Sequence, residues 1–203
     1  MAIYVYPKFI RLWHVINALM CLILIFTGIT MQYAGVENGF VPFKTSVSLH
    51  NICGIILSLN YLLFIIGNLF TSNGKHYRFV LKGSIMRLFK QVRYYTYGLF
   101  KHEKAPFPVT TESKFNPIQR FTYIAVMFAF VPFVVFTGIA MLYPGLIFDH
   151  IFNVSGLLIF DITHIISGFC ISIFLLIHVY FCTIGASPTS NFKSIVNGWH
   201  EEH

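Results

Sequence analysis

The sequence predicts an all-α membrane protein, a four-transmembrane-helix bundle with a cytoplasmic interfacial helix between spans two and three. Of its 203 residues, 56% are hydrophobic and only 10% are charged, which is outside the range of ordinary soluble domains. Four stretches lack Asp, Glu, Lys and Arg, and each is long enough to cross about 30 Å of hydrocarbon. They cover residues 12–36, 45–74, 121–148 and 162–192. We expect residues 1–203 to form a single membrane domain.

The basic residues predict how the chain is oriented. Of 14 Lys and Arg residues, only Lys44 falls in either loop on the side opposite the termini. The positive-inside rule therefore places both termini and the basic loop 72–119 in the cytoplasm. The net charge of +7 is explained by this topology. Because no soluble basic domain accompanies it, we expect no nucleic-acid binding.

The first span, 11–35, begins with a cation and an imidazole three residues apart. Arg11 marks the cytoplasmic edge, and His14 lies just inside the membrane. Haem iron takes an axial imidazole, and the haem propionates favour a cation. The alternative is an interfacial histidine beside an arginine that only sets topology. On these two residues alone, the interpretations are evenly balanced.

The second and third spans, 47–71 and 120–143, differ in their polar content. His50 enters the second span early, near the outer face, whereas the third span has no histidine. We expect Pro132 to kink the third span. We also expect His150, in the second outer loop, to be solvated, and His76 and His102 to lie on the surface of the cytoplasmic loop.

The cytoplasmic loop 72–119 contains an amphipathic stretch. Ile85, Leu88, Phe89 and Val92 recur at helical spacing among lysines and arginines. Such a basic amphipathic helix beside a membrane span lies on anionic lipid by default, with a soluble partner as the alternative.

The fourth span, 157–185, carries His164 and His178. Fourteen helical residues separate them by about 21 Å and bring them within about 40° of one face. An ionisable group inside a membrane costs a few kcal/mol and usually faces a partner, a pathway or a cofactor. This arrangement suits two haems at different depths. The four cysteines lie scattered in apolar runs, which indicates neither a disulfide framework nor an iron–sulfur site.

An internal repeat relates the two halves of the chain. Residues 26–33 and 136–143 agree at six of eight positions, and residues 49–54 align with 163–168. The second alignment sets His50 on His164 and Gly54 on Gly168. Each histidine could then supply one axial ligand to a shared outer haem, and the glycines would leave room for the macrocycle.

The repeat fails at the second pair of histidines. His178 aligns with Phe64, so we pair His178 with His14, which lies at the same cytoplasmic depth. The alternative is that Thr-Gly recurs through helix packing and that the histidines make scattered polar contacts. Four histidines at two depths favour haem ligation.

These residues resemble the four-helix di-haem cytochrome b subunits of bacterial membrane oxidoreductases. The family includes the gamma subunit of formate dehydrogenase, thiosulfate reductase cytochrome b and hydrogenase cytochrome b. The resemblance extends over almost the whole chain and is carried by Arg11-Leu-Trp-His14, His50, Asn116-Pro-Ile-Gln-Arg120, and His164 with His178. It implies two haem b groups, with His50 and His164 on the outer iron and His14 and His178 on the inner iron. It also implies electron transfer between an iron–sulfur subunit, which serves a catalytic oxidoreductase subunit, and menaquinone or ubiquinone. The resemblance further implies a multi-pass protein of the bacterial inner membrane, with both termini cytoplasmic.

In that family the quinone pocket lies at the entry to the third span. Asn116 and Gln119 are therefore candidates to hydrogen-bond a quinone carbonyl. Their alternative role is an ordinary helix start, since Asn before Pro is common there. Two other functions stay open: a stand-alone b561-like quinone-reactive cytochrome, and a transporter whose histidines relay protons or bind a metal ion.

Overall fold

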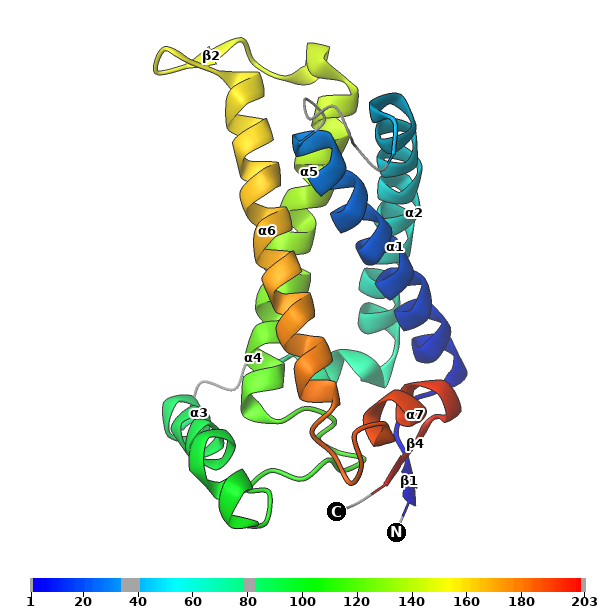
Figure 1. The fold of residues 1–203 in the computed structure, drawn as a ribbon, viewed down its shortest axis with the longest axis vertical. Coiled ribbons are helices and arrows are strands. Elements are labelled where there is room, and N and C mark those ends of the chain that lie inside the picture. The colour runs from blue at the N-terminus through cyan, green and yellow to red at the C-terminus, as the bar shows by residue number, and fades with distance from the viewer. Residues whose placement is uncertain (1, 34–40, 79–82, 202–203) are drawn as a thin grey trace. The chain divides into compact units, whose positions relative to one another are not determined.

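The computed structural model describes residues 2–33, 41–78 and 83–201, and they are mostly helical (Figure 1). The helices are α1 (Lys8–Gln32), α2 (Phe43–Phe70), η1 (Ser72–Tyr77), α3 (Ser84–Arg93), η2 (Tyr94–Gly98), η3 (Leu99–Lys101), α4 (Pro117–Ala125), η4 (Val126–Phe130), α5 (Val131–Leu142), η5 (Pro144–Leu146), α6 (Gly156–Cys182) and α7 (Ser190–Asn197). The short strands are β1 (Ala2–Tyr4), β2 (His150–Ile151), β3 (Val154–Ser155) and β4 (Trp199–Glu201).

Four of these helical segments are long and apolar enough to cross a membrane. They are α1, α2, the continuous run Pro117–Leu142 made of α4, η4 and α5, and α6. The predicted all-α fold with four spans is confirmed, and the predicted bounds differ from the observed ones by a few residues. Positions 34 and 35 of the predicted first span lie outside the described residues.

The described residues cluster into two compact units. One contains residues 12–66 and 129–173, and the other contains residues 1–11, 67–128 and 174–203, each without the undescribed positions. The prediction that 1–203 acts as a single membrane domain stays a prediction. The units are treated separately below.

In the unit containing residues 12–66 and 129–173, α1 and α2 lie side by side as a hairpin (Figure 1). Met20, Cys53 and Leu57 form a small buried cluster at their contact. The fully buried side chains there are polar, Thr27 and Ser46, whereas leucines and isoleucines on the same helices are exposed. Polar contacts inside and apolar side chains outside are expected for helices in lipid, where apolar burial gives no driving force.

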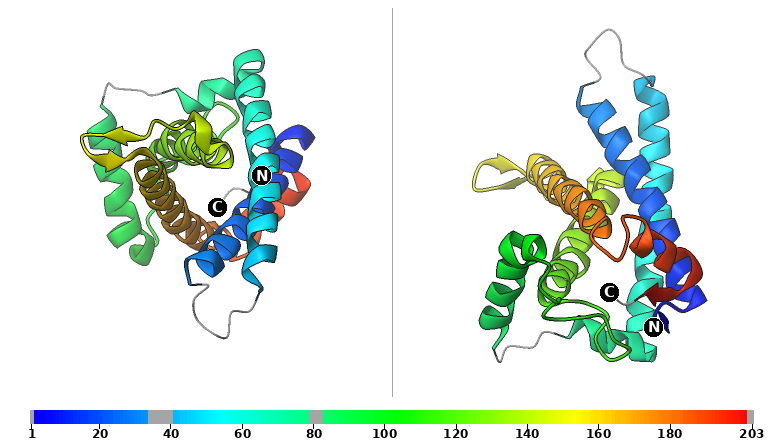
Figure 2. Two further views of the ribbon diagram at one scale, coloured as in Figure 1. Left: turned by 90° about the horizontal axis from the view of Figure 1, so that it is seen from above. Right: turned by 60° about the horizontal axis from the view of Figure 1, so that its bottom comes forward.

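The other unit joins the two ends of the chain. Strands β1 and β4 pair antiparallel with Tyr4 opposite Trp199, and both termini are seen together in Figure 2. The Tyr4 and Trp199 rings are in edge contact at 5.4 Å between centroids. Gly198, at a φ of 90°, provides the tight turn before β4, where a side chain would collide with Tyr4 and the Tyr6 carbonyl. This pairing predicts that both termini lie on the same side of the membrane.

The third span departs from regular helix just before Pro132. Proline has no N–H to bond the carbonyl four residues earlier, here that of Phe128. The disturbance takes the form of a π-helical turn over Val126–Phe130, directly before α5.

Candidate haem site

The structure brings His50 of α2 and His164 of α6 together. Their ring centroids are 6.1 Å apart, and the ring planes are inclined by 61°. A metal–imidazole bond is about 2.0–2.1 Å long, and the ring centre lies about 1.1 Å behind the bonding nitrogen. Two imidazoles on opposite sides of one metal ion therefore have centres about 6 Å apart. The observed spacing fits two axial ligands of one iron.

Each of these histidines contacts a buried threonine from the neighbouring helix of its own hairpin. His50 Nδ1 lies 2.9 Å from Thr27 Oγ1 on α1. His164 Nδ1 lies 2.9 Å from Thr137 Oγ1 on α5. Because Nδ1 is occupied on both rings, Nε2 is the nitrogen left to bind iron.

Glycines shape the surroundings of both rings. A Cβ added at Gly28 would lie 3.6 Å from His50 Cε1, and one at Gly138 would lie 3.1 Å from His164 Cε1. Added at Gly54 or Gly168, it would meet no atom within 4 Å. These last two glycines lie one turn after His50 and His164 on the same helix faces, so the backbone there leaves open space beside each imidazole.

The donor set fits haem better than a metal ion held by protein ligands alone. Among the described residues, no group of three or more His, Cys, Asp or Glu side chains could hold a metal ion. Structural and catalytic zinc sites use three or four protein ligands. Two neighbouring imidazoles from different helices suit an iron whose other ligands come from a macrocycle.

His178 lies further along α6 and belongs to the unit that contains α4. Its Nδ1 lies 3.2 Å from the Tyr123 hydroxyl, and its ring stacks on Phe174 at 5.6 Å between centroids. The Cys182 sulfur lies 3.8 Å from its Nε2. Tyr123 was not among the residues predicted from the sequence, although its position one turn after Gln119 places the two residues on one face of α4.

His14 lies on α1, in the other compact unit. Its neighbour Trp13 donates a hydrogen bond from Nε1 to the Asn60 carbonyl at 3.0 Å, and Asn60 Nδ2 donates to the Trp13 carbonyl at 3.3 Å. Trp13 also stacks on Phe64. These contacts hold the first turns of α1 at a fixed position along α2. The pairing of His14 with His178 stays a prediction.

Asn116 and Gln119 form a capping box at the start of α4. Asn116 Oδ1 accepts from the Gln119 N–H at 2.9 Å, and Gln119 Oε1 accepts from the Asn116 N–H at 3.1 Å. Asn116 Nδ2 donates to the Tyr95 hydroxyl at 2.8 Å. The helix-start role is therefore present. Gln119 Nε2 makes no hydrogen bond to a described residue, and it is the donor left for a ligand.

Arg11, the predicted partner of a haem propionate, contacts the C-terminal segment. Its Nη1 donates to the carbonyl of Val196 on α7, while its buried Nε has no hydrogen-bond partner among the described residues. The propionate role stays a prediction.

The expectation that His76 lies on the surface is wrong. Its side chain is only 2% exposed, lies edge-on to Phe115, and has no hydrogen-bond partner at Nδ1 within the described part of the chain. Burial, with the cations Lys114, Lys75 and Arg120, lowers the pKa of His76 from 6.5 to about 4, and Glu112 opposes the shift. His76 is therefore neutral at physiological pH. His102 and His150 are exposed as expected.

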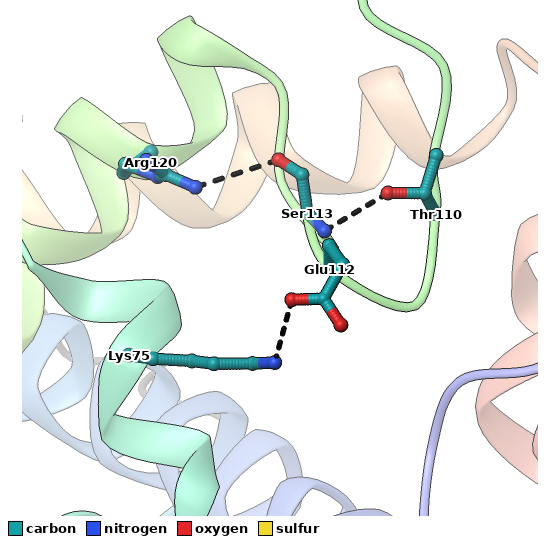
Figure 3. A network of polar contacts seen from close by, with 5 residues as sticks. All are labelled: Lys75, Thr110, Glu112, Ser113 and Arg120. Atoms are coloured by element: carbon teal, nitrogen blue, oxygen red, sulfur yellow. Dashed lines mark hydrogen bonds and ion pairs between the residues drawn. The ribbon is translucent and has the colours of Figure 1, made fainter.

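A polar network joins the loop residues Thr110, Glu112 and Ser113 to Lys75 and Arg120, close to this histidine in the sequence (Figure 3). Lys75 Nζ lies 3.0 Å from Glu112 Oε2, and Arg120 Nη2 donates to Ser113 Oγ at 3.4 Å. The Ser113 N–H donates to Thr110 Oγ1 at 3.0 Å. Arg120 therefore anchors the loop to α4 in addition to contributing a charge at the start of the third span.

The four apolar spans and the opposed histidines fit one class of protein, a multi-pass membrane cytochrome of b type. Comparison with known proteins leads to the same class. The chain belongs to the prokaryotic cytochrome b561 family, whose profile matches residues 5–198. It is 39% identical over 198 residues to the Escherichia coli (strain K12) protein named "Putative cytochrome YdhU", covering 98% of this chain and 74% of that relative. No solved structure matches the chain significantly.

Family membership establishes that the chain is a bacterial b-type cytochrome of the membrane. It does not establish the particular oxidoreductase subunits that the sequence resembles. The family binds b-type haem and functions in electron transfer. The number of haems, the quinone and the partner subunits are finer statements, and we treat them as proposals.

Proposed function

We propose that this protein carries electrons through the membrane by way of two b-type haems and exchanges them with a quinone near the cytoplasmic side. The observation that carries the proposal is the His50–His164 pair, with its 6.1 Å spacing and with Nε2 left available on both rings. His14 and His178 are the proposed ligands of the second, inner iron.

The protein's own contribution is positioning and insulation. Haem iron, when bound, supplies reversible one-electron chemistry. His50 and His164 would hold the outer iron through their imidazoles, and two protein ligands on one haem iron would leave no open coordination site for oxygen chemistry. Apolar side chains around the spans exclude water, and the reaction requires no catalytic nucleophile from the chain.

The stand-alone b561-like mode is the form of this function that we favour, because the family profile covers nearly the whole chain. In this mode the chain reacts with quinone and a diffusible partner without a permanent complex. The other form is a subunit that receives electrons from an iron–sulfur protein serving a catalytic oxidoreductase subunit. Purification in mild detergent separates the two, since only the second form brings an iron–sulfur protein with it.

Gln119 is the strongest candidate for the quinone contact. Its Nε2 is a free donor among the described residues, and Tyr123, one turn later on α4, reaches the proposed inner ligand His178. Asn116 would support this site indirectly, because its amide groups already serve the helix cap and Tyr95. Quinone carbonyls accept hydrogen bonds, so the amide donor of Gln119 has the chemistry to bind one of them.

The test is spectroscopic. We expect purified protein to contain two haems per chain and to show reduced-minus-oxidised α bands of b type. Replacing His50 or His164 with leucine should remove one haem and leave the other. Replacing His14 or His178 should remove the other haem. Loss of the same haem from both pairs of variants would refute the pairing, and absence of any haem from the wild-type protein would refute the function.

A further inference from the structure

The two threonines beside the outer histidines also lie within hydrogen-bond distance of backbone carbonyls. Thr27 Oγ1 donates to the Ile23 carbonyl at 2.8 Å, and Thr137 Oγ1 donates to the Phe133 carbonyl at 2.6 Å. A hydroxyl has one hydrogen to donate and two lone pairs that accept. A hydroxyl that gives its hydrogen to the backbone can only accept from the histidine, which would place the proton on Nδ1 and the lone pair on Nε2 of each ring.

Both threonines occupy positions where a hydroxyl is otherwise costly. Thr27 is 0% exposed and Thr137 is 3% exposed, in helices whose environment is apolar. Each is followed by a glycine, Gly28 or Gly138, beside which the histidine Cε1 lies. Two consecutive residues, Thr and Gly, thus supply a hydrogen-bonding hydroxyl and the space for the histidine ring.

The arrangement is the same in both halves of the repeat. Thr27 on α1 holds His50 on α2, and Thr137 on α5 holds His164 on α6, at 2.9 Å in each case. Each hairpin therefore fixes its own histidine, and the two fixed histidines meet at the shared position. This gives the repeated Thr-Gly a role beyond helix packing.

We propose that Thr27 and Thr137 are positioning residues that set the tautomer, the ring orientation and the donor strength of the two axial histidines. The inference rests on the proposed haem function. An acceptor on Nδ1–H makes an imidazole more electron-donating toward its metal, and it does so strongly when it is a carboxylate. A neutral hydroxyl already committed to a backbone carbonyl is a weak acceptor. It fixes the ring and favours the oxidised iron only weakly, so it lowers the potential of the outer haem by less than a carboxylate would.

The test compares isosteric and conservative replacements. Thr27→Val and Thr137→Val keep the shape of the side chain and remove the acceptor, whereas Thr27→Ser and Thr137→Ser retain it. We expect each valine variant to raise the midpoint potential of the outer haem and to change its low-spin ferric EPR signal, while the inner haem is unaffected. The serine variants should restore both properties.

Thr163→Val is the matched control. Thr163 directly precedes His164, and its Oγ1 donates to the Ile159 carbonyl at 2.7 Å in the same manner, but no described contact joins it to a histidine ring. We expect the wild-type potential and EPR signal from this variant.

Each outcome decides the inference. If valine causes loss of only the outer haem and serine retains it, the positioning role is supported. If the outer-haem potential and EPR signal are unchanged in both valine variants, or if serine behaves like valine, the inference is overturned while the cytochrome function stands. Absence of haem from the wild-type protein would instead refute the proposed function itself.

Discussion

At the residue scale, the two glycines that face the outer histidines are not equivalent. We expect Gly138→Ala to perturb the outer haem, because its Cβ would lie 3.1 Å from His164 Cε1 and force the ring to shift. Gly28→Ala places its Cβ at an ordinary 3.6 Å from His50 Cε1, and alanine favours a helix by up to about 1 kcal/mol over glycine. EPR spectra of the ferric haem and thermal unfolding check both variants. Equal effects of the two substitutions would contradict this prediction.

The capping box separates the structural role of Gln119 from its proposed quinone role. Gln119→Glu keeps an acceptor for the Asn116 N–H and so keeps the helix start, but it removes the Nε2 donor. Losing one hydrogen bond of about 1 kcal/mol predicts quinol-dependent haem reduction slowed by roughly fivefold to tenfold, with both haems retained. Stopped-flow reduction by quinol measures this rate.

Asn116→Asp is the control for that experiment, since aspartate also caps a helix and Gln119 Nε2 is left intact. We expect this variant to react at nearly the wild-type rate. Wild-type kinetics in Gln119→Glu would dismiss the proposed contact.

His76 predicts a loss of stability in acid. Its pKa is lowered from 6.5 to about 4 by burial and by Lys114, Lys75 and Arg120, so between these pH values the unfolded chain binds a proton that the folded chain does not. Stability therefore falls as the pH drops from about 6.5 to about 4, by a few kcal/mol at most. The wild-type unfolding midpoint should decrease over this range, and His76→Gln should decrease less. The exposed His150→Gln should follow the wild-type curve, and parallel curves for all three proteins would contradict the prediction.

The sequence predicted part of this residue-scale picture. The repeat alone indicated that His50 and His164 face a common position, and the structure places them together; their role as iron ligands stays a prediction. The Thr-Gly positions were visible in the repeat, but their histidine contacts depend on the rotation of α1 against α2 and of α5 against α6. His76 was misplaced for a similar reason, because its burial comes from Phe115, nearly forty residues away.

At the element scale, α3 presents an apolar face with no described partner. Ile85, Met86 and Phe89 are each about 70% exposed, and the segment from Ser84 to Lys104 carries five basic residues against one acidic residue. Arg93 is paired with Glu103 through two 3.0 Å bonds, which fixes the end of the helix. An exposed apolar face flanked by cations is typical of a helix lying on anionic lipid.

We therefore predict that α3 lies in the membrane interface. Phe89→Trp should add fluorescence that brominated anionic lipids quench, after subtraction of the signal from native Trp13 and Trp199. Thr111→Trp, at an exposed site in the polar loop, should be quenched by aqueous acrylamide instead. Equal quenching of both sites by acrylamide would place α3 in water or against a soluble partner.

The spans themselves were predictable because length and apolar composition suffice to define a transmembrane helix. The ends of the spans were harder to predict. α6 ends at Cys182, and Asn191 Nδ2 donates to the carbonyls of Cys182 and Ile184, so its end depends on a residue of α7 that no local pattern indicates. The π-helical turn before Pro132 was likewise not predicted, since proline specifies a lost hydrogen bond but not how the helix adjusts.

At the scale of the whole molecule, charge and strand pairing bear on topology in different ways. The β1–β4 pairing predicts that both termini lie on one side of the membrane, but it does not indicate which side. The distribution of the 14 Lys and Arg residues supplies that choice, because all but Lys44 lie on the side of the termini. The expected orientation is therefore cytoplasmic termini, with the β2–β3 hairpin on the outer face.

Reporter fusions test this orientation directly. A green fluorescent protein at the C-terminus should fluoresce, and alkaline phosphatase at the same position should be inactive, because the enzyme needs an oxidising compartment for its disulfides. Alkaline phosphatase fused after Phe152, a 96% exposed residue at the tip of the β2–β3 hairpin, should be active. The reverse pattern would show that the basic loop faces outward. The predicted depths of both histidine pairs would then be inverted, and the proposed quinone contact at Gln119 would move to the outer face.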